Sequence, residues 1–243
     1  MPNLLGNLSA SSASKRLLML LRHYPIRKTA AVCAAMIDDY HVRSFDRKYG
    51  VRTSGHIELS ETSFDTSKLN KATSYGPVNA WGFRKLLQIL NLPKPYSFVD
   101  LGCGLGRACI IAAEYGFSKV TGVELAPELC RVARENVVNC RVSDARNLPI
   151  KIIEGDVLDY CDHSQDDVYF MYRAFSLDFF RDVLGKLTGR AAVTKKPFTV
   201  IYTERLGWPQ SPCVSTLAED PALQRVYEGS MFGQAFFVYR CQA

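Results

Sequence analysis

The chain has 243 residues, of which 47% are apolar and 22% charged, and its formal net charge is +6. These values exclude a disordered or fibrous protein, and the length suits one α/β domain with an added segment. The sequence holds 8 cysteines without a C-x-x-C pair, a pattern that favours a reduced, intracellular protein with no metal site. No apolar run reaches the ~18 residues that a membrane-spanning helix needs.

The first 94 residues are expected to form a flexible start, residues 1–14, and a helical cap, residues 15–94. No acid precedes Asp38, whereas basic residues recur over 15–28. That balance is typical of a transit peptide, which would direct the protein to the mitochondrion, or of a basic helix at a membrane surface. A helix that packs on the domain is favoured over both, and the expected location is therefore the cytoplasm.

Strands and helices alternate from residue 95 to the C-terminus. Parallel strands need crossover helices, so this order predicts an α/β fold: a doubly wound, mostly parallel seven-stranded sheet with an antiparallel C-terminal hairpin. The predicted strands are 96–101, 119–125, 150–156, 167–173, 198–204, 223–229 and 233–241, and the predicted helices are 105–116, 127–138 and 176–187.

A glycine turn follows the first of these strands, in the stretch "FVDLGCGLGRACIIAA". Gly102 and Gly104 allow the backbone to approach a ligand closely, and the next helix start offers free N–H groups. A dinucleotide site needs a third glycine three residues after the second, but Arg107 stands there and Gly106 comes one residue early. The spacing therefore disfavours a nicotinamide oxidoreductase.

Acidic residues stand at the ends of three successive strands. Asp100 would repel a pyrophosphate but can bind an ammonium group, Glu124 can accept hydrogen bonds from ribose hydroxyls, and Asp156 can accept one from an adenine amino group. An ammonium group, a ribose and an adenine without phosphate describe S-adenosylmethionine. Leu125 and Val157, which follow two of these acids, complete the predicted cofactor site together with the glycine turn.

The runs "VDLGCGLGR", "VTGVELAPELCRVAREN" and "IIEGDVLDY" resemble the motifs of class I S-adenosylmethionine-dependent methyltransferases, over roughly residues 70–180. Together with "FDRKYGVRTSG" and "YGP", they are similar to uncharacterised bacterial methyltransferases and to the non-SET lysine methyltransferases. The resemblance implies that Tyr75 lies over the methionine part of the cofactor. A helix-capping role for this aromatic residue before Pro77 is the alternative.

The methyl acceptor is less defined. In methyltransferases that act on exocyclic amines the fourth strand ends in Asn or Asp before Pro-Pro, whereas this chain reads "MYRAFS" there, which makes Tyr172, Arg173 and Phe175 the catalytic candidates. A protein lysine or a small molecule is the expected acceptor, and a degenerate enzyme that binds cofactor without transfer is an alternative. A nucleic-acid-binding module is disfavoured, because the basic residues do not interleave with aromatic ones. His56 and Glu58 could belong to a lid over the site.

Overall fold

The computed structural model describes residues 43–55, 75–141, 148–207 and 209–242, which all belong to one compact unit, Val42–Ala243. The expected flexible start, the basic run at 15–28, His56 and Glu58 lie outside the described residues. The described parts of the expected cap include a helix over 43–49 and helix α3, Ala80–Leu90. A cap extending over residues 15–94 stays a prediction.

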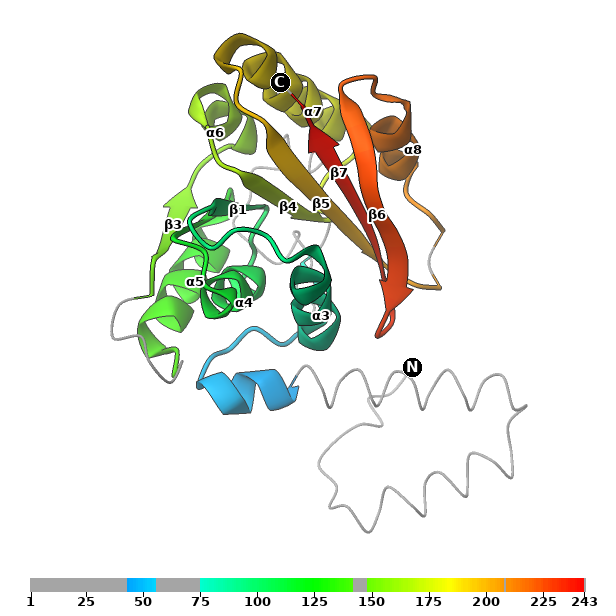
Figure 1. Cartoon of the computed structure of the whole chain (residues 1–243). Coiled ribbons are helices and arrows are strands. Elements are labelled where there is room, and N and C mark those ends of the chain that lie inside the picture. The colour runs from blue at the N-terminus through cyan, green and yellow to red at the C-terminus, as the bar shows by residue number, and fades with distance from the viewer. Residues whose placement is uncertain (1–42, 56–74, 142–147, 208, 243) are drawn as a thin grey trace, which may run out of the picture. The chain divides into compact units, whose positions relative to one another are not determined.

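A seven-stranded sheet with the order β3-β2-β1-β4-β5-β7-β6 forms the centre of the unit (Figure 1). The first five strands are parallel, while β7 is antiparallel to both β5 and β6. The predicted doubly wound sheet with an antiparallel hairpin is therefore confirmed. The strands are β1 (Ser97–Leu101), β2 (Lys119–Glu124), β3 (Ile150–Glu154), β4 (Val168–Tyr172), β5 (Phe198–Arg205), β6 (Leu223–Met231) and β7 (Gln234–Cys241).

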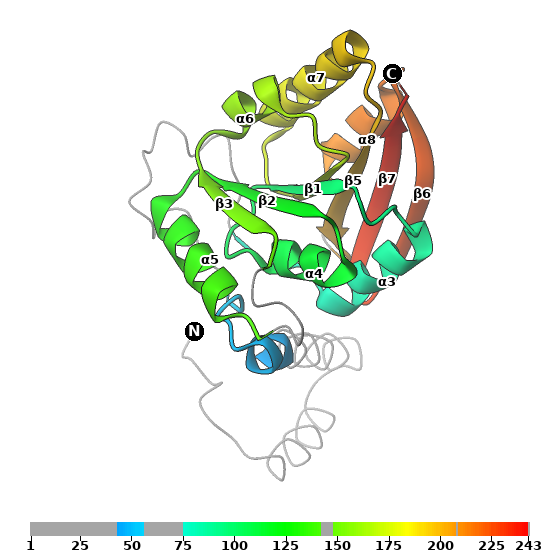
Figure 2. The same ribbon diagram turned by 60° about the vertical axis from the view of Figure 1, so that its left-hand side comes forward.

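Helices cover both faces of the sheet (Figure 2). Helices α3, α4 (Arg107–Tyr115) and α5 (Pro127–Asn139) pack on one face, and α6 (Val157–His163), α7 (Leu177–Thr194) and α8 (Pro212–Glu219) pack on the other. Alternation along β1 explains the two layers, because Phe98 joins the core of the first face while Val99 joins that of the second. Each face of the sheet therefore has its own hydrophobic core.

Helices α6 and α8 were not predicted from the sequence. Each is only about two turns long, so apolar periodicity gives little signal. Both begin at a capping side chain: Asp156 accepts a hydrogen bond from the Leu158 amide, and Ser211 accepts one from the Cys213 amide. Helix α3 shows the same device, since the Asn79 side chain accepts from Trp81 and Gly82.

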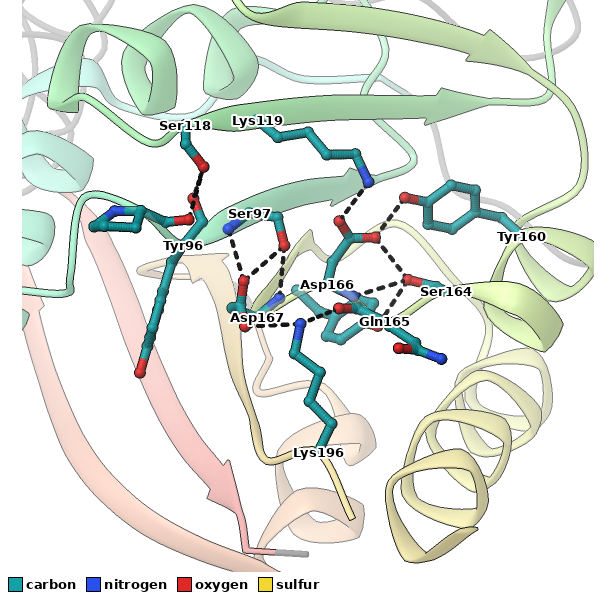
Figure 3. A network of polar contacts seen from close by, with 12 residues as sticks. Tyr96, Ser97, Ser118, Lys119, Tyr160, Ser164, Gln165, Asp166, Asp167 and Lys196 are labelled. Atoms are coloured by element: carbon teal, nitrogen blue, oxygen red, sulfur yellow. Dashed lines mark hydrogen bonds and ion pairs between the residues drawn. The ribbon is translucent and has the colours of Figure 1, made fainter. Parts of the chain in front are cut away.

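A network of polar contacts ties the amino-terminal ends of the parallel strands together (Figure 3). Asp167, just before β4, accepts from the amide and hydroxyl of Ser97 and pairs with Lys196 at 2.9 Å. Its neighbour Asp166 accepts from the Tyr160 hydroxyl at 2.6 Å and pairs with Lys119 at 3.0 Å. Burial works against ionisation of Asp166, but these hydrogen bonds and the ammonium group lower its pKa below the usual range. These acids have a structural role, which separates them from the acids at the opposite ends of the strands.

Candidate functional site

A pocket of about 840 Å³, counted with its open mouth, lies at the carboxyl ends of β1, β2 and β4. This is the edge of a doubly wound sheet where ligands bind. Asp100, Gly104, Glu124 and Asp156 all line it, although they are separated by up to 56 positions in sequence. Parallel strands bring them together because each strand ends at the same edge.

The glycine turn forms the floor of the pocket in a conformation that ordinary residues adopt with strain. Gly102 has φ +80°, and a Cβ there would lie 2.8 Å from the Cβ of Ala174. Gly104 has φ +51°, and a Cβ there would lie 2.1 Å from the ring of Tyr75. Glycine is therefore required at both positions, because the backbone angles disfavour other residues and the space for a side chain is already occupied. Gly106, the third predicted glycine, is the N-cap of α4 and does not line the pocket.

Asp100 is 3% exposed at the end of β1. Burial, and then the negative charge of Glu124, raise its pKa to about 8. The Cys109 thiol donates a weak hydrogen bond to it at 3.9 Å. Two acids in one buried pocket repel each other, so the site favours a ligand that brings a positive charge.

The Glu124 carboxylate, at the end of β2, accepts hydrogen bonds from the glycine turn and from the two residues that follow β2. One carboxylate oxygen accepts from the Gly104 amide at 2.9 Å, and the other accepts from the amides of Leu125 and Ala126, each at 2.9 Å. Burial raises the pKa of Glu124 despite these three bonds, each of which lowers it. Because a carboxylate oxygen has two lone pairs, the oxygen that binds Gly104 can still accept one ligand hydroxyl.

The third acid, Asp156, lines the pocket at the start of α6. One of its oxygens accepts from the Leu158 amide at 2.9 Å, which fixes the carboxylate beside Val157. Val157 and Leu125 line the pocket as well, and both are apolar walls. The predicted cofactor residues therefore lie together, except for Gly106.

The three catalytic candidates are placed differently. Tyr172 and Phe175 line the pocket at the end of β4. Arg173 is not among the lining residues, and its guanidinium donates to the carbonyl of Pro209 at 3.2 Å. Arg173 has φ +42°, a left-handed backbone conformation that L-residues other than Gly, Asn and Asp adopt at a cost. The strand-end turn thereby directs the arginine away and leaves a tyrosine at the pocket.

Several apolar lining residues had no signal in the sequence that separated them from ordinary core. Leu129, Phe170 and Phe179 complete the wall of the pocket, and Pro77 and Val78 extend it next to Tyr75. Their positions depend on packing between elements, which periodicity does not report.

Within residues 43–55, 75–141, 148–207 and 209–242, no group of three or more His, Cys, Asp and Glu side chains is arranged to hold a metal ion. The same residues include no helix that is long and apolar enough to cross a membrane.

Comparison with known proteins gives a match at the same part of the chain. Residues 98–187 match the family model described as a methyltransferase domain. The ribosomal protein L11 methyltransferase of Laribacter hongkongensis is 30% identical over 118 residues, which cover 45% of this chain and 40% of that protein. The norajmaline N-methyltransferase of Rauvolfia serpentina is 33% identical over 90 residues, which cover 32% and 30% of the two chains. The chain thus spans two fifths or less of the length of these relatives.

A solved structure shares the fold. The ribosomal protein L11 methylase of Lactobacillus delbrueckii subsp. bulgaricus superposes with a TM-score of 0.52 at 18% identity, covering 71% of this chain and 82% of that one.

Proposed function

We propose that this chain, which carries a class I S-adenosylmethionine-dependent methyltransferase domain, transfers a methyl group to an amine of a protein substrate. The domain is the one that the glycine turn and the strand-end acids predicted, and that prediction is confirmed. The observation that carries the proposal is the meeting of three strand-end acids and a glycine turn in one pocket.

The pocket residues fit S-adenosylmethionine by their chemistry. The Tyr75 ring occupies the space that a Cβ at Gly104 would fill, so the glycine lets this aromatic wall of the pocket lie directly against the turn. Asp100 would bind the ammonium group, because a positive charge beside this buried carboxyl would stabilise its ionised form. Glu124 and Asp156 would accept hydrogen bonds from the ribose hydroxyls and the adenine amino group.

Positioning is the main task that remains for the protein. When bound, S-adenosylmethionine supplies a methyl group on a sulfonium, an electrophile that needs no further activation. An acceptor amine must be neutral and in line with the breaking bond, and orientation of that kind provides much of the rate gain. Tyr172 would orient the acceptor through its hydroxyl, while Phe175 and Phe179 exclude water from the site.

The acceptor class rests on the relatives and on the strand-four end. One relative is named for a ribosomal protein and another for the nitrogen of a small molecule. The "MYRAFS" end lacks the Asn or Asp that binds exocyclic amines of nucleobases, which favours a protein amine. Ribosomal RNA is the alternative acceptor, because a protein that reaches a ribosomal protein also meets the RNA bound to it.

Binding and transfer can be tested separately. Isothermal titration with S-adenosylhomocysteine and NADH should give saturable binding of the first alone. Labelled S-adenosylmethionine should then be offered to ribosomal proteins, to deproteinised ribosomal RNA and to small amines. Label in protein that is retained after nuclease treatment supports the proposal, and label in RNA or a small amine replaces the acceptor class. Binding without transfer to any of them would indicate a degenerate enzyme.

A further inference from the structure

Arg107 occupies the position where a dinucleotide site has its third glycine, and the structure gives this residue a task of its own. Its side chain is 2% exposed at the start of α4 and lines the pocket. The guanidinium lies over the ring of Phe45 at 4.7 Å and pairs with Asp46 at 3.2 Å. Both partners belong to residues 43–55, called here the upstream segment.

Asp46 closes the upstream segment into a compact loop. One of its oxygens accepts from the Thr53 hydroxyl at 2.6 Å and the other from the Thr53 amide at 2.9 Å. The Arg107 Nε donates to the same Thr53 hydroxyl at 2.7 Å. Thr53, which is fully buried, is therefore bound by Asp46 of its own segment and by Arg107 at the start of α4.

Helix α5 binds Arg52, the residue that precedes Thr53 in the upstream segment. The Asn136 side chain accepts from the Arg52 amide at 2.7 Å and donates to the Arg52 carbonyl at 2.9 Å. It also donates to the Leu105 carbonyl within the glycine turn at 3.0 Å. Asn136 is 2% exposed, so a lost bond here would leave a buried polar group without a partner. Arg52 and Thr53 are thus fixed relative to the turn from two sides.

The fixed backbone of Thr53 carries a contact to the pocket. Its carbonyl accepts a hydrogen bond from the Tyr75 hydroxyl at 2.8 Å. The Tyr75 ring occupies the space beside Gly104 and lines the pocket. A chain of contacts therefore runs from Arg107 through Thr53 to the ring that covers the glycine turn.

We infer that Arg107, Asp46 and Thr53 are positioning residues for the cofactor, which hold Tyr75 over the glycine turn. The inference rests on the proposed function. It makes the upstream segment part of the binding site although no residue of that segment lines the pocket. Arg107 stands where a dinucleotide site has its third glycine, and here it binds Thr53, which in turn holds the Tyr75 ring at the pocket.

A double-mutant cycle on the affinity for S-adenosylhomocysteine tests the inference. Tyr75→Phe removes the bond to the Thr53 carbonyl, and Thr53→Val removes the hydroxyl that binds Arg107 and Asp46. Each should weaken binding about fivefold, the value of one hydrogen bond. Because both act through the position of the same ring, the double variant should also be about fivefold weaker, and not the ~25-fold expected of independent effects.

Two further variants separate positioning from general stability. Thr53→Ser keeps the hydroxyl and should keep the wild-type affinity. Thr203→Val removes another buried hydroxyl bond, 2.7 Å to the Ala235 carbonyl, and should lower the unfolding temperature without changing the affinity. If Thr53→Val does not fold, Asp46→Asn takes its place in the cycle. Additive losses, or an unchanged affinity of Thr53→Val and Asp46→Asn, would overturn the inference. Absence of binding to the wild type would instead overturn the proposed function.

Discussion

The wild-type protein should release close to one proton when it binds S-adenosylhomocysteine at pH 7, and Asp100→Asn should release none. Burial and the charge of Glu124 raise the pKa of Asp100 to about 8. At pH 7 roughly nine in ten molecules therefore carry Asp100 protonated. The ammonium group of the ligand favours the ionised carboxylate and so displaces the proton.

The same pKa sets the size of the effect on affinity. One pH unit corresponds to about 1.4 kcal/mol, so the affinity at pH 7 should lie about tenfold below the limit set by the fully ionised carboxylate. The affinity should rise about tenfold from pH 6 to pH 7, because the ionised fraction of Asp100 rises by that factor.

Calorimetric titration in phosphate and in Tris measures the proton count, because the two buffers differ in their enthalpy of ionisation. The wild-type binding heat should differ between the buffers at pH 7, and the heat of Asp100→Asn should not. A wild-type heat that is independent of buffer would refute the assignment of Asp100 as the ammonium partner, as would equal proton release by both proteins.

Three further predictions concern stability, the glycine turn and transfer. Asp100 has a raised folded pKa, so its contribution to stability is complete below about pH 4 and is lost as the pH rises through 8. Asp100→Asn should therefore unfold at a higher temperature than the ligand-free wild type at pH 9, by about 2–4 °C per ~1 kcal/mol, and the two should converge near pH 4. Gly104→Ala should abolish binding of S-adenosylhomocysteine, because the new methyl group would lie 2.1 Å from the Tyr75 ring. The control is Gly185→Ala in α7, where no atom lies within 4 Å of the added Cβ. This variant should bind normally, and its free energy of unfolding should rise by roughly 0.5–1 kcal/mol. Tyr172→Phe should lower the transfer rate at least ~10-fold with unchanged cofactor affinity, in the range of positioned acid–base or orienting groups, and an unchanged rate would remove Tyr172 from the site.

The sequence was sufficient to predict the sheet and most of the polar residues that meet in the pocket. Strand-end acids such as Asp100 and Glu124 could be predicted to lie close together because parallel strands end at a common edge, whatever the packing between them. The spacing of the glycines also separated this turn from a dinucleotide site, because Arg107 stands at the position of the third glycine. Periodicity and strand order are local properties, and they predicted the mostly parallel sheet that the structure has.

Details of the pocket depended on contacts between distant residues. Glu124 accepts three backbone amides and braces the turn, which no pattern of residue types reports. Arg173, a catalytic candidate in the sequence, does not line the pocket, and its guanidinium donates instead to the Pro209 carbonyl.

The amino-acid sequence by itself determined the fold class, the cofactor class and the acids that line the pocket, because these follow from hydrophobic period and from residue types at strand ends. Only the tertiary structure decided that Arg107 reaches Asp46, 61 positions earlier, and that Thr53 meets Tyr75. Such contacts require two buried polar groups to meet with matched donors and acceptors, and that geometry arises from the packing of whole elements.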